Sequence, residues 1–152
     1  MPPRVWTEAL GPDGNLCVQL NGVPHCSIKP SPIHGRGFYA ARAFRKGDYL
    51  GTFTGQAVAA SDAASHNQGY LMALTRPGGK GAGLIDTSSG SAPYCQFMNS
   101  SWHTPLRNNA RFNSRGTVVA TRTIKPGEEA LVSYGSHYWR GHAGALAADQ
   151  SQ

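Results

Sequence analysis

The apolar and polar positions along this chain form short runs that are interrupted by frequent turns. Runs of β-branched, aromatic and aliphatic residues alternate with turn signals such as Asn21-Gly22, Lys46-Gly47-Asp48 and Pro126-Gly127. Such runs favour strands, and the Gly and Pro positions between them favour tight turns. The strands predicted on this basis are 17–20, 37–40, 49–54, 70–75, 84–87, 117–123 and 130–133.

Helices have little room in this sequence. Its 19 Gly and 10 Pro residues leave few uninterrupted windows of a helix's usual length. The Ala- and Ser-rich segment 57–68 is predicted to form one short helix, and 136–142 a terminal helical turn. We find no internal repeat. The 152 residues therefore predict a single, mostly β domain with one core.

The charge of the chain is moderately basic. Fourteen Lys and Arg residues against eight Asp and Glu give a formal net charge of +6, which favours encounter with acidic partners. The basic residues are spread along the chain and form no tail, so a nucleic-acid partner is not required. No stretch approaches the roughly 20 apolar residues that a membrane span needs, which argues against a membrane partner.

Cysteine and histidine usage indicates neither a disulfide framework nor a metal site. Cys17, Cys26 and Cys95 are odd in number and lack the spacing of zinc ligands. Reduced thiols predict an intracellular protein, in nucleus or cytoplasm. The six histidines are scattered without ligand spacing, so no metal is expected.

The glycine-rich string GRGFYA, Gly35 to Ala40, is the first candidate for chemistry. Its form, GxGxxA, occurs in dinucleotide-binding turns, which need an apolar strand before and a helix after. Here Pro30 and Pro32 precede it and a Lys-Gly turn follows, so that interpretation is disfavoured. Two alternatives remain: a glycine turn without a ligand, or a place where a small molecule approaches the backbone closely.

A longer block, GRGFYAARAFRKGDYLGTFTG, resembles the opening pattern of the SET-domain family. Three more blocks follow in the family's order: YLMALTR with LIDTSSGSAPYCQFMNSS, then NNARF, then IKPGEEALVSYGSHYW. The similarity runs from Ile28 to Arg140. It implies a strand or hairpin extension over 1–27, a SET domain over 28–140 and a disordered tail over 141–152.

The resemblance implies both a fold and a reaction. The fold would consist of several small twisted sheets and short helices, with a pseudoknot-like C-terminal threading that brings Asn99 near Tyr134. The reaction would move a methyl group from S-adenosylmethionine to a lysine of another protein, histone tails being the family's commonest substrates. Since a free lysine has a pKa near 10.4, only about one in a thousand is neutral near pH 7.4, which costs roughly 4 kcal/mol. An apolar aromatic channel would favour the neutral amine.

Site residues follow from the matched blocks. Tyr134 matches the family's catalytic tyrosine, and Tyr70 matches a tyrosine that lines the lysine channel. Phe112 falls where some members place a channel residue that controls the number of methyl groups added. For all three, ordinary packing in the core is the alternative.

The resemblance also assigns cofactor contacts. Backbone near the second glycine would meet the amino-acid end of S-adenosylmethionine, an asparagine would bond nearby, and a tryptophan would stack on the adenine. For that tryptophan, docking on the core is the alternative. The residues implied are Arg36, Gly37, Phe38, Asn99, Ser100 and Trp139.

The sequence departs from the family in its asparagine block, which reads NSSWHTPLRNN. Ser100 replaces the usual His, Trp102 the usual Cys, and several residues intervene before Asn109. The sequence lacks the cysteine cluster that completes the lysine channel in many relatives, so Tyr138 with Trp139, or a second copy in a homodimer, would close the pocket instead. Two alternatives stay open: a catalytically inactive SET-like protein-binding module, and a small basic β-domain that binds nucleic acid.

Overall fold

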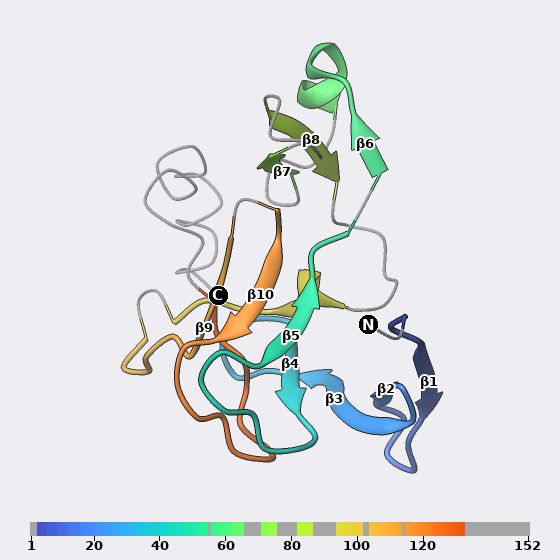
Figure 1. The fold of residues 1–152 in the computed structure, drawn as a ribbon, viewed down its shortest axis with the longest axis vertical. Helices are drawn as coiled ribbons and strands as arrows, with labels where there is room; N and C mark the ends of the chain where they lie inside the picture. The colour runs from blue at the N-terminus through green and yellow to red at the C-terminus, as the bar shows by residue number, and fades with distance from the viewer. Residues whose placement is uncertain are drawn as a thin grey trace.

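The computed structural model describes residues 3–54, 56–65, 71–75, 82–86, 94–101, 104–113 and 115–132. These residues form three small antiparallel sheets and two 3-10 helices, arranged as in Figure 1. The predicted mostly β fold of small sheets is confirmed. The sheets are β1-β2-β3-β4 (Trp6–Leu10, Leu16–Leu20, Val23–Pro30, Arg36–Ala40), β5-β10-β9 (Tyr49–Thr52, Thr117–Ala120, Ala110–Phe112) and β6-β8-β7 (Gln56–Val58, Ala82–Asp86, Leu71–Thr75), with helices η1 (Ala60–Ser65) and η3 (Cys95–Phe97).

Six predicted strands correspond to β2, β4, β5, β7, β8 and β10 within a few residues. Strands β1, β3, β6 and β9 were not predicted. In β3, prolines at positions 24 and 30 argue against a central strand. The sheet accommodates Pro24 beside a register shift between Val18 and Gln19 of β2. The Asn21-Gly22 turn has φ values of 51° and 81°, the backbone of a tight hairpin turn.

The predicted helix over 57–68 is wrong at its start. Ala57 and Val58 belong to β6 and pair with Ile85 and Leu84 of β8, so pairing overrides local preference. A 3-10 helix, η1, follows, and 66–68 lies outside the described residues, as does the predicted turn 136–142. Neither described helix is long or apolar enough to cross a membrane.

Segment 128–132 connects parts of the chain that are far apart in sequence. On one side it pairs with β4, since Ala130 N–H donates to Phe38 O at 2.8 Å. On the other, Val132 N–H donates to Asn99 O at 2.9 Å, and isolated parallel bridges join Asn99 to Leu131 and Ala110 to Val132. The threading expected of the chain that leads to Tyr134 is thus confirmed as far as Val132.

Loops 41–48 and 121–128, which we call the paired loops, repeat one structure. Phe44 and Ile124 exchange two backbone hydrogen bonds, each 2.9 Å long. Gly47 N–H donates to the carbonyl of residue 120 and Gly127 N–H to that of residue 40, both at 2.8 Å. The φ values of these glycines are 90° and 87°. The conclusion that the chain has no repeat is therefore wrong: AARAFRKGD and ATRTIKPGE are two copies of one loop.

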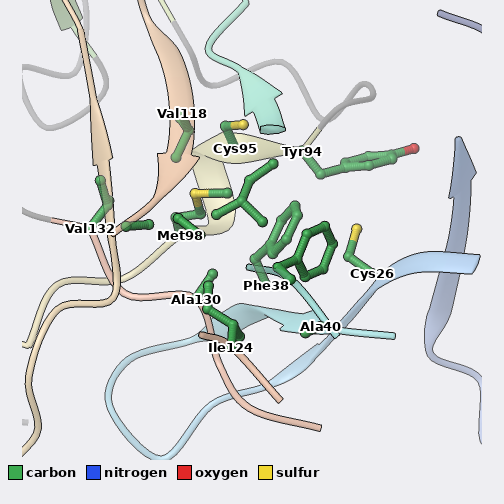
Figure 2. Packing of buried hydrophobic residues seen from close by; sticks show 14 of the residues in the cluster. Cys26, Phe38, Ala40, Tyr94, Cys95, Met98, Val118, Ile124, Ala130 and Val132 are labelled. Atoms are coloured by element: carbon green, nitrogen blue, oxygen red, sulfur yellow. The ribbon is translucent and has the colours of Figure 1, made fainter. Parts of the chain in front are cut away.

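The core lies where these elements converge. Figure 2 shows Phe38, Met98, Val118 and Ile124 turned toward one another, and all are at most 1% exposed. Burial raises the pKa of the Cys95 thiol, and likewise that of Cys26, so both core thiols stay protonated.

Asn109 fastens segment 128–132 from within this core. Its side chain is 1% exposed, and its carboxamide bonds one backbone N–H and one backbone C=O, as a neighbouring strand would. Oδ1 accepts from Leu131 N–H at 2.8 Å, and Nδ2 donates to Glu129 O at 2.9 Å. Both ends of the amide are therefore used by backbone groups of a single segment.

We expect Asn109→Ala to lower the free energy of unfolding by about 2–4 kcal/mol, because two backbone groups lose their partners in a buried place. Urea denaturation measures this. Asn113→Ala is the matched control: its Oδ1 also accepts from backbone N–H groups, of Arg115 and Thr117, but its side chain is exposed. Equal losses in the two variants would contradict the role assigned to Asn109.

His25 is a second buried polar group, with 1% exposure. Its Nε2 lies 2.7 Å from Leu50 O and must donate, because a carbonyl only accepts. Ring centroids of Trp6 and Phe44 lie 5.1 and 5.0 Å away, both edge-on. Burial lowers the pKa of His25 below its ordinary value of 6.5.

Because the pKa of His25 is lower in the folded state, the unfolded state binds the proton first as pH falls. Stability should therefore drop as pH falls through 6.5 and below. Urea midpoints measured between about pH 7.5 and 5.5 test this. His25→Gln should flatten the pH dependence, and the exposed His34→Gln should not. An unchanged slope in His25→Gln would exclude this histidine as its source.

Candidate functional site

Asn99 lies at the meeting point of the glycine-rich block and segment 128–132. One atom of its carboxamide lies 3.0 Å from His34 O, 3.2 Å from Arg36 O and 2.9 Å from Glu129 Oε2. All three neighbours are acceptors, so this atom is the amide nitrogen, and the orientation of the side chain follows from chemistry. The oxygen Oδ1 points elsewhere and accepts no hydrogen bond from the described part of the chain.

The turn before Asn99 is anchored in the core. Tyr94 has a φ of 65°, unusual for a bulky residue, and helix η3 follows it directly. Cys95 and Met98 are 0% and 1% exposed. Because its neighbours are buried and its own carbonyl accepts from Val132 N–H, Asn99 is held in place from both directions along the chain.

Glu129 organises the other side of the site. Ser31 Oγ donates to its carboxylate, 2.9 Å from Oε1 and 3.0 Å from Oε2. The same Oγ accepts from Ile33 N–H at 3.0 Å, and Ser31 N–H donates to Gly35 O at 2.8 Å. One carboxylate therefore ties the turn over 31–35 to Asn99.

Glycine is required at the two positions of the GxG string for different physical reasons. Gly35 has a φ of 47°, which favours glycine. A Cβ on Gly37 would lie 2.8 Å from Glu129 Cδ and 3.1 Å from Ser31 Cβ, closer than real side chains approach. The missing side chain of Gly37 thus makes room for the Glu129 carboxylate.

Glu129 also affects Tyr39, because the backbones of the two residues form an antiparallel β-bridge. Partial burial, and then the negative charge of Glu129, raise the pKa of the Tyr39 hydroxyl. The hydroxyl donates to Pro30 O at 3.3 Å, and the Lys29 ammonium lies 4.4 Å from the ring centroid. Tyr39 therefore remains a neutral donor that braces the strand carrying Gly37.

The structure brings together four residues of the predicted cofactor set: Arg36, Gly37, Phe38 and Asn99. The Arg36 side chain is exposed while its carbonyl faces Asn99. The Phe38 side chain is fully buried, and its carbonyl accepts from Ala130 N–H. Ser100 follows Asn99 directly and is half-buried.

Phe112 lies elsewhere. Its ring packs edge-to-face on Phe53, with centroids 5.3 Å apart, in the sheet β5-β10-β9. Within the described residues, no hydrogen bond or ring contact joins it to Asn99 or Glu129, so its place in a lysine channel stays a prediction.

Tyr134, Tyr70 and Trp139 lie outside the described residues. Within the described part, no group of three or more His, Cys, Asp or Glu side chains is placed to hold a metal. In the asparagine block, Ser101 N–H donates to Asn108 Oδ1 at 2.9 Å, which ties together two residues on either side of the inserted positions.

Glu129 belongs to the candidate site, and the sequence analysis did not assign it a place there. The signal available was its position in EEALVSYG, the block that carries Tyr134. Its partners, Ser31 and Asn99, are distant in sequence and become visible only in the folded chain.

Comparison with known proteins agrees with this geometry. The chain matches the family model described as SET domain over residues 35–135. Its structure resembles the methyltransferase domain of human PR domain-containing protein 2, with a TM-score of 0.53, 22% identity, and 74% of this chain and 78% of that one covered. It also resembles the SET domain of the RIZ1 tumor suppressor (PRDM2), with a TM-score of 0.54, 21% identity, and 83% and 78% covered.

A search of curated proteins gave no significant match. The structural likenesses, at these identities, establish the fold alone. The family model, however, spans about two thirds of the sequence. The chain therefore belongs to the SET-domain family.

Proposed function

We propose that this chain is an S-adenosylmethionine-dependent protein-lysine N-methyltransferase. The observation that carries the proposal is the Asn99 carboxamide, whose nitrogen is held by three acceptors and whose oxygen accepts no hydrogen bond from the residues that the structure describes. This arrangement joins three blocks of the family pattern, the GxG string, the asparagine block and EEALVSYG, at one place.

The polar groups around Asn99 fit the amino-acid end of S-adenosylmethionine. That end carries an ammonium, which needs acceptors, and Asn99 Oδ1 is an acceptor whose direction is fixed. Neighbouring backbone of Arg36 and Ser100 supplies further polar groups. When bound, the cofactor supplies an electrophilic methyl group on a sulfonium.

The chain's own part is to position a neutral lysine amine. Positioning of this kind supplies about 7–11 kcal/mol of a barrier. We assign the orienting hydroxyl to Tyr134 and the apolar channel wall to Tyr70. Support comes from Val132, whose N–H is bonded to Asn99 O and which stands two residues before Tyr134 in the sequence.

A protein lysine is the proposed target, and core histones are the first substrate to test. Attraction of a basic tail by Glu128 and Glu129 is not supported. Glu129 is bonded to Ser31 and Asn99, and Glu128 accepts from Lys125 N–H and lies 3.8 Å from Arg122 Nη1. Recognition of a substrate would therefore rest on shape and hydrogen bonds more than on charge.

Calorimetric titration of the purified chain with S-adenosylmethionine is the first test, and we expect micromolar binding. Labelled methyl transfer to core histones follows. Tyr134→Phe should lower the rate about 100-fold or more, because it removes a group at the reacting centre, while cofactor affinity changes little. A folded sample that does not bind the cofactor would favour the catalytically inactive binding module.

We expect Glu129→Gln to weaken cofactor binding about 10-fold, because a charged hydrogen-bond acceptor that holds Asn99 and the 31–35 turn is lost. Calorimetry measures the affinity, and thermal unfolding reports stability separately. Glu128→Gln removes the same charge one residue away, outside the site, and should leave affinity unchanged. Equal losses in both variants would mean that net charge, and not the position of Asn99, controls binding.

A further inference from the structure

The paired loops concentrate positive charge on one end of the molecule. They carry five cationic side chains and only two carboxylates. Backbone pairing of Phe44 with Ile124 holds the loops side by side, and Figure 1 shows them at the lower end, away from sheet β6-β8-β7. The cations are Arg42, Arg45, Lys46, Arg122 and Lys125, and the acids are Asp48 and Glu128.

Both carboxylates are committed within their own loops. Asp48 Oδ2 accepts from Arg45 N–H at 2.8 Å and lies 3.9 Å from Arg42 Nη1. Glu128 repeats this, accepting from Lys125 N–H at 2.9 Å and facing Arg122. Each loop thus satisfies one arginine internally.

Three cations have no such ion pair, two on loop 41–48 and one on loop 121–128. The side chains of Arg45, Lys46 and Lys125 are exposed and have no carboxylate partner in the part of the chain that the structure describes. Arg107 is also exposed and lies beside the second loop, since its carbonyl is 3.5 Å from Arg122 Nη2. The surface is therefore cationic even after internal pairing is counted.

The rest of this surface is small and polar. Ala41, Ala43 and Thr123 are exposed, and the turns contain Gly47 and Gly127, so an extended partner meets no bulky side chain. The large apolar residues of the loops point inward: Phe44 and Ile124 are both 0% exposed. A surface that binds membranes by insertion needs large exposed apolar side chains, and the apolar residues that these loops expose are the small Ala41, Ala43 and Pro126.

We propose that the paired-loop surface binds the phosphodiester backbone of duplex nucleic acid without reading its sequence. Exposed Arg and Lys on two adjacent loops present several cations on one surface, and contacts of such cations with phosphates position a protein without specifying bases. The inference is independent of the proposed methyl transfer. It also gives the net charge of +6 a role that a lysine-bearing substrate does not.

The test is fluorescence anisotropy of a labelled random-sequence DNA duplex of about 20 base pairs, titrated with the full chain at about 50–200 mM salt. Wild type should bind with an affinity that falls steeply with salt. Arg45→Gln/Lys125→Gln should bind about 10-fold more weakly at low salt, with a log–log salt slope smaller by about 1.8, since each lost phosphate contact removes about 0.9. The backbone N–H groups that bond Asp48 and Glu128 remain in this variant.

Arg111→Gln/Arg115→Gln is the matched control, because it removes two exposed cations from β9 and the turn after it. It should keep nearly the wild-type slope. Equal weakening in both variants, or no binding by wild type, would overturn the proposal. So would loop-dependent binding to vesicles containing phosphatidylserine that is tighter than binding to DNA. Unchanged affinity for S-adenosylmethionine in both variants would show that the paired-loop surface and the site around Asn99 act independently.

Discussion

The fold depends on the capture of segment 128–132 between segments that are distant in sequence. The segment pairs antiparallel with β4 on one side and forms parallel bridges with Asn99 and Ala110 on the other. The Asn109 side chain adds bonds to Leu131 N–H and Glu129 O on that second side. A buried carboxamide is stabilising only when each of its ends is satisfied, since desolvation of an unpaired end costs more than the bond returns. Asn109 meets that condition and so converts a loose C-terminal segment into part of the core.

The same capture creates the candidate site. Glu129 lies in the middle of the segment, and its carboxylate reaches Ser31 and Asn99, which otherwise share no bond. Gly37 has no side chain because that carboxylate occupies the space. Orientation of Asn99 is thereby set by the threading and not by a local turn. A change that loosens the segment would therefore disturb both stability and the acceptor that Asn99 presents.

Local pattern was sufficient where local forces decide the structure. The β-branched run in β10 and the Asn21-Gly22 turn formed as predicted, and the family blocks indicated the threading. The local sequence pattern was insufficient where a partner distant in sequence determines the structure. Strand β9 is three residues long and exists because β10 and segment 128–132 flank it. The repeat of the paired loops was not predicted because only a few equivalent residues are identical, and Phe44 and Ile124 share apolar character alone. The repeat is clear only in the backbone hydrogen bonds.

The distribution of charge completes the physical description. Asp48, Glu128 and Glu129 are each bonded within the molecule, to backbone N–H groups, to a serine or to an amide. On the paired loops, the internal bonds of Asp48 and Glu128 leave the cations as the charges that solvent and partners meet. Long-range attraction therefore favours polyanions over lysine-rich peptides, and a basic substrate must overcome a repulsive field before any contact forms. A duplex held at the paired loops would screen that field, which makes a nucleic-acid surface and a lysine-directed site compatible on a single small domain.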